Sequence, residues 1–203
     1  MKRAPPQSSN VPSCSVAYLE AQRRPFVERR AFLRDAFWSS GMVLTGGALG
    51  FSNAALAKKR APLPAFSLPL LSGETFSSDA VHGKVLVISF WATWCAPCLQ
   101  ELPHLDRLLT TYKKWGAVGI AISTDAPETS ATVASVVKRK GLRLPVAHDA
   151  DGNVTARLNP QGSNPYTVFV DKKGRVALRH EGYSPGDEKN HEKILRILLQ
   201  EPG

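Results

Sequence analysis

The chain has 203 residues, of which 43% are hydrophobic and 21% are charged, a composition typical of a soluble globular protein. It excludes a wholly disordered chain, a collagen and a protein that crosses a membrane many times. The formal net charge is +9, and +4 of it lies in residues 1–57. An ordinary basic surface accounts for the remainder, so we expect no nucleic-acid partner.

Residues 1–57 have the pattern of a targeting sequence. The pair Arg29-Arg30 follows a segment that we expect to be disordered, and precedes an uncharged, glycine-rich stretch, 36–57, that ends in Ala-Leu-Ala. These parts make a secretory signal, and the paired arginines resemble the twin-arginine type. A basic amphipathic helix packed on the domain and a single membrane anchor are the alternatives. We expect cleavage near Ala57 and delivery to the periplasm of a bacterial envelope, which leaves residues 58–203 as one domain.

The pattern of residues 58–203 predicts an α/β fold. In chain order we expect a β-hairpin over 66–76, a buried strand over 85–91, a helix over 97–112, a buried strand over 117–122, a helix ending at Gly141, two strands over 167–180 and a last helix. Asp125 and Glu128 have the spacing of a capping box, and Ser184 is the expected N-cap of the last helix. This order predicts a mixed sheet with helices on both faces.

The segment Trp94-Cys95-Ala96-Pro97-Cys98 follows the first buried strand and begins a helix. Its C-x-x-C spacing allows the two sulfurs to form a disulfide. A helix N-terminus stabilises a thiolate and lowers the pKa of the thiol, and Pro97 suits the first turn. We expect Cys95 to be exposed and nucleophilic and Cys98 to be partly covered. Trp94, Ala96 and Pro97 are the expected substrate contacts around them.

A C-x-x-C pair is also half of a zinc site, which needs two further ligands. Cys14 is the only other cysteine and lies before the expected cleavage site, and the five histidines form no H-x₃₋₅-H pair. We therefore expect no metal and no cofactor. A strand, a C-x-x-C pair and a helix in succession indicate a redox-active dithiol instead.

The run Ser89–Cys98, followed by Glu101 and Pro103, resembles the thioredoxin superfamily, and more narrowly the TlpA/ResA-like thiol:disulfide oxidoreductases of bacterial envelopes. The resemblance implies a thioredoxin-like fold, a central mixed sheet flanked by helices with an N-terminal β-hairpin. It also implies a catalytic acid three residues after the second cysteine, which Glu101 matches. As a half-buried carboxylate with a raised pKa, Glu101 would exchange a proton with Cys98. A solvated helix glutamate is the alternative.

The resemblance further implies a cis-proline that faces the disulfide, for which Pro165 is the candidate. A cis bond turns the backbone of the preceding residue, Asn164, outward, where it can pair with a substrate strand. The family more often has an apolar residue at that position, so substrate preference is left open. A trans proline in a loop is the alternative.

For function, the resemblance implies a monomeric reductase of protein disulfides that acts in cytochrome c maturation, on apocytochrome c thiols, or in envelope redox homeostasis. Its electrons would come from a membrane thiol carrier of the DsbD/CcdA kind. Two alternatives stay open. Residues 147–152 resemble a peroxiredoxin, although Cys95 lacks the usual P-x-x-x-T-x-x-C pattern. A copper-delivery protein would use C-x-x-x-C with a distant histidine, and His148 is the candidate for that histidine.

Overall fold

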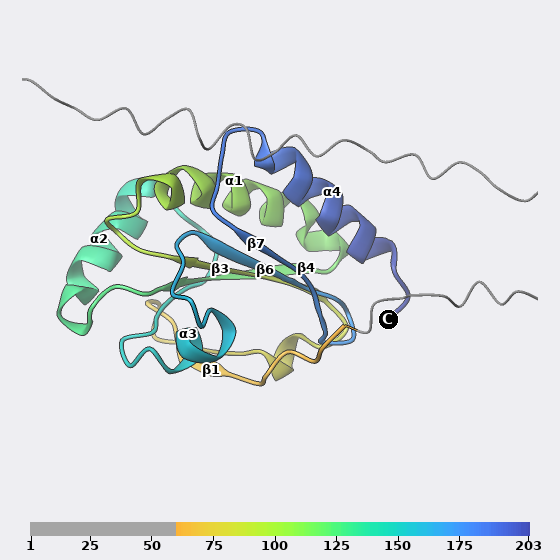
Figure 1. The fold of residues 1–203 in the computed structure, drawn as a ribbon, viewed down its shortest axis with the longest axis horizontal. Helices are drawn as coiled ribbons and strands as arrows, with labels where there is room; N and C mark the ends of the chain where they lie inside the picture. Colours follow the sequence, from red (N-terminus) through yellow and green to blue (C-terminus); the bar gives the residue numbers. More distant parts are fainter. Residues whose placement is uncertain (1–59) are drawn as a thin grey trace, which may run out of the picture. The chain divides into compact units, whose positions relative to one another are not determined.

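The structure, a computed structural model, describes residues 60–203, so the predicted signal lies outside the described residues. A five-stranded sheet with strand order β5-β4-β3-β6-β7 forms its centre (Figure 1). The middle strand, β3 (Val85–Trp91), pairs in parallel with β4 (Ala117–Ser123) and antiparallel with β6 (Tyr166–Val170). The sheet is therefore mixed, as the sequence predicted.

Two further strands complete the sheet, and a hairpin stands apart from it. At one edge β5 (Val146–His148) runs parallel to β4, and at the other β7 (Val176–Glu181) runs antiparallel to β6. The hairpin joins β1 (Ser67–Pro69) to β2 (Thr75–Ser77) as a separate antiparallel pair. It confirms the predicted N-terminal β-hairpin.

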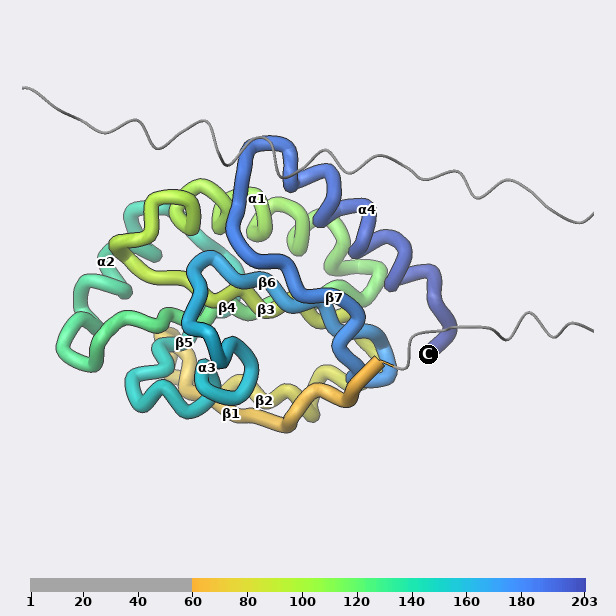
Figure 2. The backbone as a smooth tube through the Cα atoms, viewed as in Figure 1, coloured from red at the N-terminus to blue at the C-terminus, as the bar shows by residue number. Residues whose placement is uncertain are grey.

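All seven residues of β3 are buried, because both faces of the sheet are covered. Side chains of β3 that alternate along the strand pack into two separate apolar clusters. Helices α1 (Ala96–Tyr112), α2 (Ser130–Lys140) and α4 (Asp187–Gln200) contribute to one cluster. The hairpin and the short helix α3 (Asn153–Leu158) contribute to the other (Figure 2). These two layers hold β3 rigidly behind the C-x-x-C segment.

The predicted capping box of α2 is wrong. The chain first makes a 3₁₀ turn over Pro127–Thr129, and α2 begins at Ser130 with no side-chain cap. The carboxylate of Asp125 is not available as a cap because it accepts hydrogen bonds from the backbone and hydroxyl of Thr93. The other end was predicted correctly, since Gly141 closes the helix with φ 62°, a conformation that favours glycine.

The predicted N-cap of α4 is also wrong. The N-cap residue is Gly186. The side chain of Ser184 does not accept from the helix; instead, its backbone N–H donates to the carboxylate of Asp187 at 2.8 Å. The sequence analysis also omitted β5 and α3. These elements have three and six residues, which is too short to show a hydrophobic period.

Candidate active site

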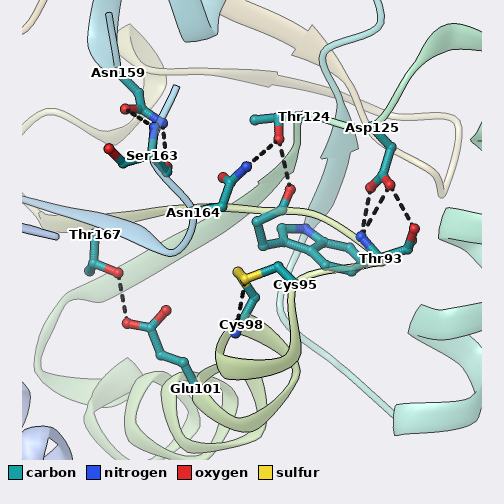
Figure 3. The surroundings of a disulfide bond; sticks show 11 residues. Thr93, Cys95, Cys98, Glu101, Thr124, Asp125, Asn159, Ser163, Asn164 and Thr167 are labelled. Atoms are coloured by element: carbon teal, nitrogen blue, oxygen red, sulfur yellow. Dashed lines mark hydrogen bonds between the residues drawn. A yellow bond between two sulfur atoms is a disulfide. The ribbon is translucent and has the colours of Figure 1, made fainter. Parts of the chain in front are cut away.

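Cys95 and Cys98 form a disulfide at the N-terminus of α1, where the chain leaves β3 (Figure 3). Cys95 is the N-cap residue, and its sulfur accepts a hydrogen bond from the backbone N–H of Cys98 at 3.2 Å. The first turn of the helix therefore directs a backbone N–H at the sulfur that would carry negative charge in the reduced protein.

The disulfide lies deeper than the sequence suggested. Cys98 is wholly buried, but Cys95 is also only 4% exposed, so the expectation of an exposed Cys95 is wrong for the oxidised protein. The hydrogen bond from Cys98 and the S–S bond draw the Cys95 sulfur toward the helix. Around it, Trp94 is 73% exposed, and Ala96 and Pro97 are exposed as well. These three residues form an accessible rim beside a recessed sulfur.

The peptide bond between Asn164 and Pro165 is cis. In Figure 3, Asn164 lies on the opposite side of the disulfide from α1. Its side-chain amide donates to the hydroxyl of Thr124 at 2.8 Å, and that hydroxyl donates to the carbonyl of Trp91. The fold thus brings the Asn164-Pro165 bond to the disulfide and ties it to the end of β3.

Glu101 lies one helical turn beyond Cys98 and is wholly buried, rather than half-buried as expected. Its Oε1 accepts a hydrogen bond from the hydroxyl of Thr167 at 2.8 Å, and its Oε2 has no partner among the described residues. Burial raises the pKa of Glu101 to about 7, and the hydrogen bond from the hydroxyl of Thr167 opposes that rise. Near neutral pH the carboxyl can therefore both bind and release a proton.

His191 of α4, which is 2% exposed, was not predicted as a site residue. Its Nδ1 lies 3.9 Å from Oε1 of Glu101. Burial lowers the pKa of His191 to about 4, and the neighbouring His180 contributes to the decrease. A signal was present in the sequence, because His191 shares the buried face of the last helix with Leu195 and Leu198.

Asp125 was assigned to a helix cap, but the structure places it against Thr93, in the loop that leads from β3 to Cys95. It is 4% exposed. Its carboxylate accepts from the backbone N–H of Thr93 at 2.9 Å and from the hydroxyl of Thr93 at 2.6 Å (Figure 3). It also accepts from the hydroxyl of Ser123 at 2.7 Å. These bonds fix the loop between β3 and Cys95 and so position the cysteines.

His148, the candidate copper ligand, has both ring nitrogens in hydrogen bonds. Its Nδ1 lies 2.8 Å from the hydroxyl of Ser130, and its Nε2 lies 2.8 Å from the carbonyl of Asp125. The ring therefore helps to hold Asp125 in place. A metal ligand would have to give up one of these bonds, which weighs against copper delivery.

Comparison with known proteins shows relatives that carry out thiol–disulfide chemistry. The profile of the AhpC/TSA family matches residues 60–179. The thiol-disulfide oxidoreductase ResA of Halalkalibacterium halodurans is 31% identical over 160 residues, which cover 73% of this chain and 88% of ResA. A crystal structure of a thiol:disulfide interchange protein of the thioredoxin family from Chlorobium tepidum is 27% identical, with a TM-score of 0.59, over 70% of this chain and 97% of that one.

A secreted disulfide oxidoreductase of Mycobacterium tuberculosis, homologous to DsbE of E. coli, is also similar. It is 26% identical, with a TM-score of 0.56, over 66% of this chain and 96% of that one. All three relatives carry names of thiol–disulfide chemistry. They favour that chemistry over the peroxidase and copper-delivery alternatives.

Proposed function

Because the chain belongs to the AhpC/TSA family and is a thiol-disulfide oxidoreductase that acts on protein thiols or disulfides, we propose that it works as a reductase in a bacterial envelope. The observation that carries the proposal is a Cys95–Cys98 disulfide that lies between Asn164, whose bond to Pro165 is cis, and the buried Glu101 (Figure 3). The dipeptide between the cysteines is Ala-Pro, not the Pro-His of the strong oxidant DsbA, and the resemblance to TlpA/ResA-like proteins also favours reduction.

The cycle begins with the reduced protein. The thiolate of Cys95 attacks a substrate disulfide, a mixed disulfide forms, and one substrate sulfur leaves as a thiolate that takes a proton. Cys98 then loses its proton and attacks the sulfur of Cys95, which breaks the mixed disulfide and releases the second substrate sulfur. Two electrons pass to the substrate, and the protein is left with the disulfide seen in the structure.

Glu101 takes the proton of Cys98 in the second step. Cys98 is wholly buried, so a base within the protein is needed where bulk water does not reach. A carboxyl with a pKa of about 7 is suited to this task, because general bases work best when their pKa lies near the operating pH. When the disulfide is reduced again, the same carboxyl returns a proton to Cys98.

The substrate binds across the rim and the cis-proline. Trp94 offers an exposed aromatic surface, with Ala96 and Pro97 beside it. On the other side, the backbone of Asn164 pairs with an extended segment of the substrate, as in other cases of strand addition. Because the side chain of Asn164 is held by Thr124, this backbone keeps a defined orientation toward the disulfide.

Cysteine variants test the division of labour. Cys98→Ser should accumulate mixed disulfides with substrate proteins, because the resolving thiol is gone, and Cys95→Ser should accumulate almost none. The double variant is the matched control for background thiol reactions, and non-reducing gels give the readout. Equal trapping by the two single variants would contradict the assignment of attack to Cys95.

The reduction potential of the Cys95–Cys98 pair tests the direction. We expect a potential below about −180 mV, in the range of reducing members of the superfamily, rather than near the value of about −120 mV found for DsbA. Equilibration with glutathione buffers measures it. A value near that of DsbA would mean that the protein oxidises its substrates.

We further propose that Arg29-Arg30 directs export and that cleavage near Ala57 releases residues 58–203 into the periplasm as a monomer. The secreted relative supports an extracytoplasmic site. Among residues 60–203, the helices are too short or too polar to cross a bilayer. In that compartment, apocytochrome c thiols are the proposed substrate and a membrane thiol carrier of the DsbD/CcdA kind the proposed donor.

Substitution of the arginine pair tests the export route. Changing both arginines to lysine keeps the charge but removes the paired guanidinium groups, and should leave uncleaved precursor in the cytoplasm. Cell fractionation and the length of the product on a gel report the result. Normal delivery of the double-lysine variant would overturn the twin-arginine assignment.

A further inference from the structure

Behind Glu101 lies a second buried titratable side chain that the thiol–disulfide cycle does not use. Nδ1 of His191 is 3.9 Å from Oε1 of Glu101, and both residues are almost completely buried. Among the described residues, neither Oε2 of Glu101 nor Nε2 of His191 has a hydrogen-bond partner. Two buried polar atoms without partners are costly to keep, so this pair calls for an explanation beyond packing.

His191 is neutral at neutral pH, so one ring nitrogen carries a hydrogen and can donate, and the other can accept. The ring of His180 stands almost perpendicular to it, with centroids 5.0 Å apart, and Nε2 of His180 lies 3.4 Å from the carboxylate of Asp187. The titratable groups around His191 come from α1, α4 and β7. They are Glu101, His104 and Tyr112 of α1, His180 of β7, and Asp187, Glu188 and Glu192 of α4.

His191 also lines a cavity between α1 and α4, which lie side by side on one face of the sheet (Figure 1). The cavity has a volume of about 310 Å³ and shares its lining with His104 and Glu188. These two side chains are 37% and 30% exposed and lie 3.5 Å apart. The cavity therefore brings the surface between α1 and α4 to the side chain of His191.

The thiol–disulfide cycle requires a route by which protons pass between Glu101 and solvent. Each oxidation of the dithiol releases the proton of Cys98, and each reduction takes one up, so Glu101 must exchange protons with bulk solvent. Glu101 is wholly buried. In the mixed disulfide, a protein substrate covers Cys95 and the rim formed by Trp94, Ala96 and Pro97, which closes the front of the site.

We propose that His191 is a proton exit for Glu101, carrying protons between that carboxyl and solvent in the cavity between α1 and α4. Nδ1 accepts the proton of Glu101 while Nε2, which is buried in this structure, gives its own proton to a water that enters from the cavity. The ring thus gains and loses one proton and ends neutral. A gap of 3.9 Å is longer than a hydrogen bond, and a small side-chain movement or one bridging water closes it. The inference rests on the proposed role of Glu101, and His191 acts through Glu101 rather than on the sulfurs.

Two substrates of different size separate this role from a structural one. The reduced protein is mixed with a folded protein disulfide or with a small aromatic disulfide, and tryptophan fluorescence follows the oxidation of Cys95 and Cys98 in a single turnover. His191→Ala should be about tenfold slower with the protein substrate, in line with the loss of one proton-transfer group. With the small disulfide the loss should be less than about twofold, because the front of the site stays open to water.

Chemical rescue gives the second readout. Added imidazole should restore the rate of His191→Ala, because it can occupy the space that the side chain leaves. His191→Leu should show the same loss without rescue, and its apolar side chain suits the neighbouring Phe169 and Leu195, so it also covers the case in which the alanine variant fails to fold. His104→Gln, which removes the other histidine of the cavity lining, is the matched control and should keep the wild-type rate.

Three results would overturn the inference. If both His191 variants match wild type on the protein substrate while Glu101→Gln remains slow, His191 is not the exit, although the role of Glu101 stands. If Glu101→Gln is also unchanged, the proposed role of Glu101 fails as well. If the loss is equal for both substrates and imidazole does not restore it, His191 only supports the packing between α4 and β6.

Discussion

Two carboxylates at opposite ends of β6 are both almost completely buried, yet their surroundings act on them in opposite directions. Asp171, 2% exposed, accepts hydrogen bonds from the side chains of Arg60 and Arg175 and from two backbone N–H groups of the following turn. Although burial opposes it, these bonds lower the pKa of Asp171. Glu101 has one hydrogen bond, from Thr167, and burial raises its pKa to about 7.

The number of hydrogen-bond donors, not burial, accounts for the opposite pKa shifts of these two carboxylates. Asp171 is held ionised, and through Arg60 it joins the start of the described chain to Glu201 near its end. Glu101 lacks a cation and keeps one oxygen without a partner among the described residues. The carboxyl with an unpartnered oxygen lies near the end of β6 that is next to the cysteines. Strongly shifted pKa values are commonest at functional sites.

The largest expected effect is on the pH dependence of stability. Glu101 has a pKa of about 7 in the folded protein and 4.5 ordinarily. Between these values the folded state binds the extra proton, so stability falls as the pH rises. Glu101→Gln removes this loss. The free energy of unfolding of the variant minus that of the wild type should therefore increase by about 3 kcal/mol between pH 4.5 and 7.

Urea denaturation of the oxidised proteins at several pH values measures this difference. His191 has an opposite effect, since its pKa of about 4 lies below the ordinary 6.5 and stability is lost as the pH falls through that window. Because both proteins contain His191, its contribution largely cancels in the difference. A difference that does not vary with pH would show that Glu101 is ionised freely and is not a buried acid.

The next effect concerns the other carboxylate. Asp171→Asn leaves Arg60 and Arg175 without their shared anion, and should lower the free energy of unfolding by about 2 kcal/mol at neutral pH. This loss of stability is smaller than the loss expected on breaking a fully buried ion pair, because both guanidinium groups are partly exposed. The deficit should shrink in acid, where the wild-type carboxylate also becomes protonated. The rate of disulfide reduction should not change, and a clear loss of rate would weaken the contrast between the two sites.

A third effect is catalytic. Glu101→Gln keeps the shape of the side chain but removes its proton exchange, so disulfide reduction near neutral pH should fall about tenfold or more. The pKa of the Cys98 thiol should also fall, because a nearby carboxylate no longer opposes the thiolate. Rate against pH and thiolate absorbance measure both, with Asp171→Asn as the control for loss of a buried charge. Overlapping profiles of variant and wild type would mean that Glu101 has no part in the cycle.

The parts of this molecule that the sequence predicted are those with local causes. The apolar run of β3, the C-x-x-C at the start of α1 and the glycine that ends α2 follow from neighbouring residues. The resemblance to a known family added Glu101 and the cis bond before Pro165, the second of which the structure confirms. Their roles in catalysis and substrate binding stay predictions.

The parts that escaped prediction depend on contacts between distant residues. Asp125 meets Thr93 across 32 positions, and Glu101 meets Thr167 across 66. No local pattern shows that Asp125 supports a loop rather than a helix end. Similarly, the complete burial of Glu101 and its contact with His191 arise only when α4 packs against α1. The sequence alone therefore predicted a half-buried glutamate and gave no sign that His191 lies beside it.

The smallest expected effect comes from the one hydrogen bond that Glu101 has. The hydroxyl of Thr167 stabilises the ionised carboxyl and keeps its pKa from rising further. Thr167→Val has nearly the same shape and suits a buried strand, but it removes that donor, so the pKa of Glu101 should rise by about one unit. If the carboxylate must accept the proton of Cys98, the rate should fall about fivefold at pH 7 and recover at higher pH. Thr167→Ser keeps the donor and should follow the wild-type profile; a rate loss in Thr167→Val that is equal at all pH values would point to disturbed packing of β6 rather than to a shifted pKa.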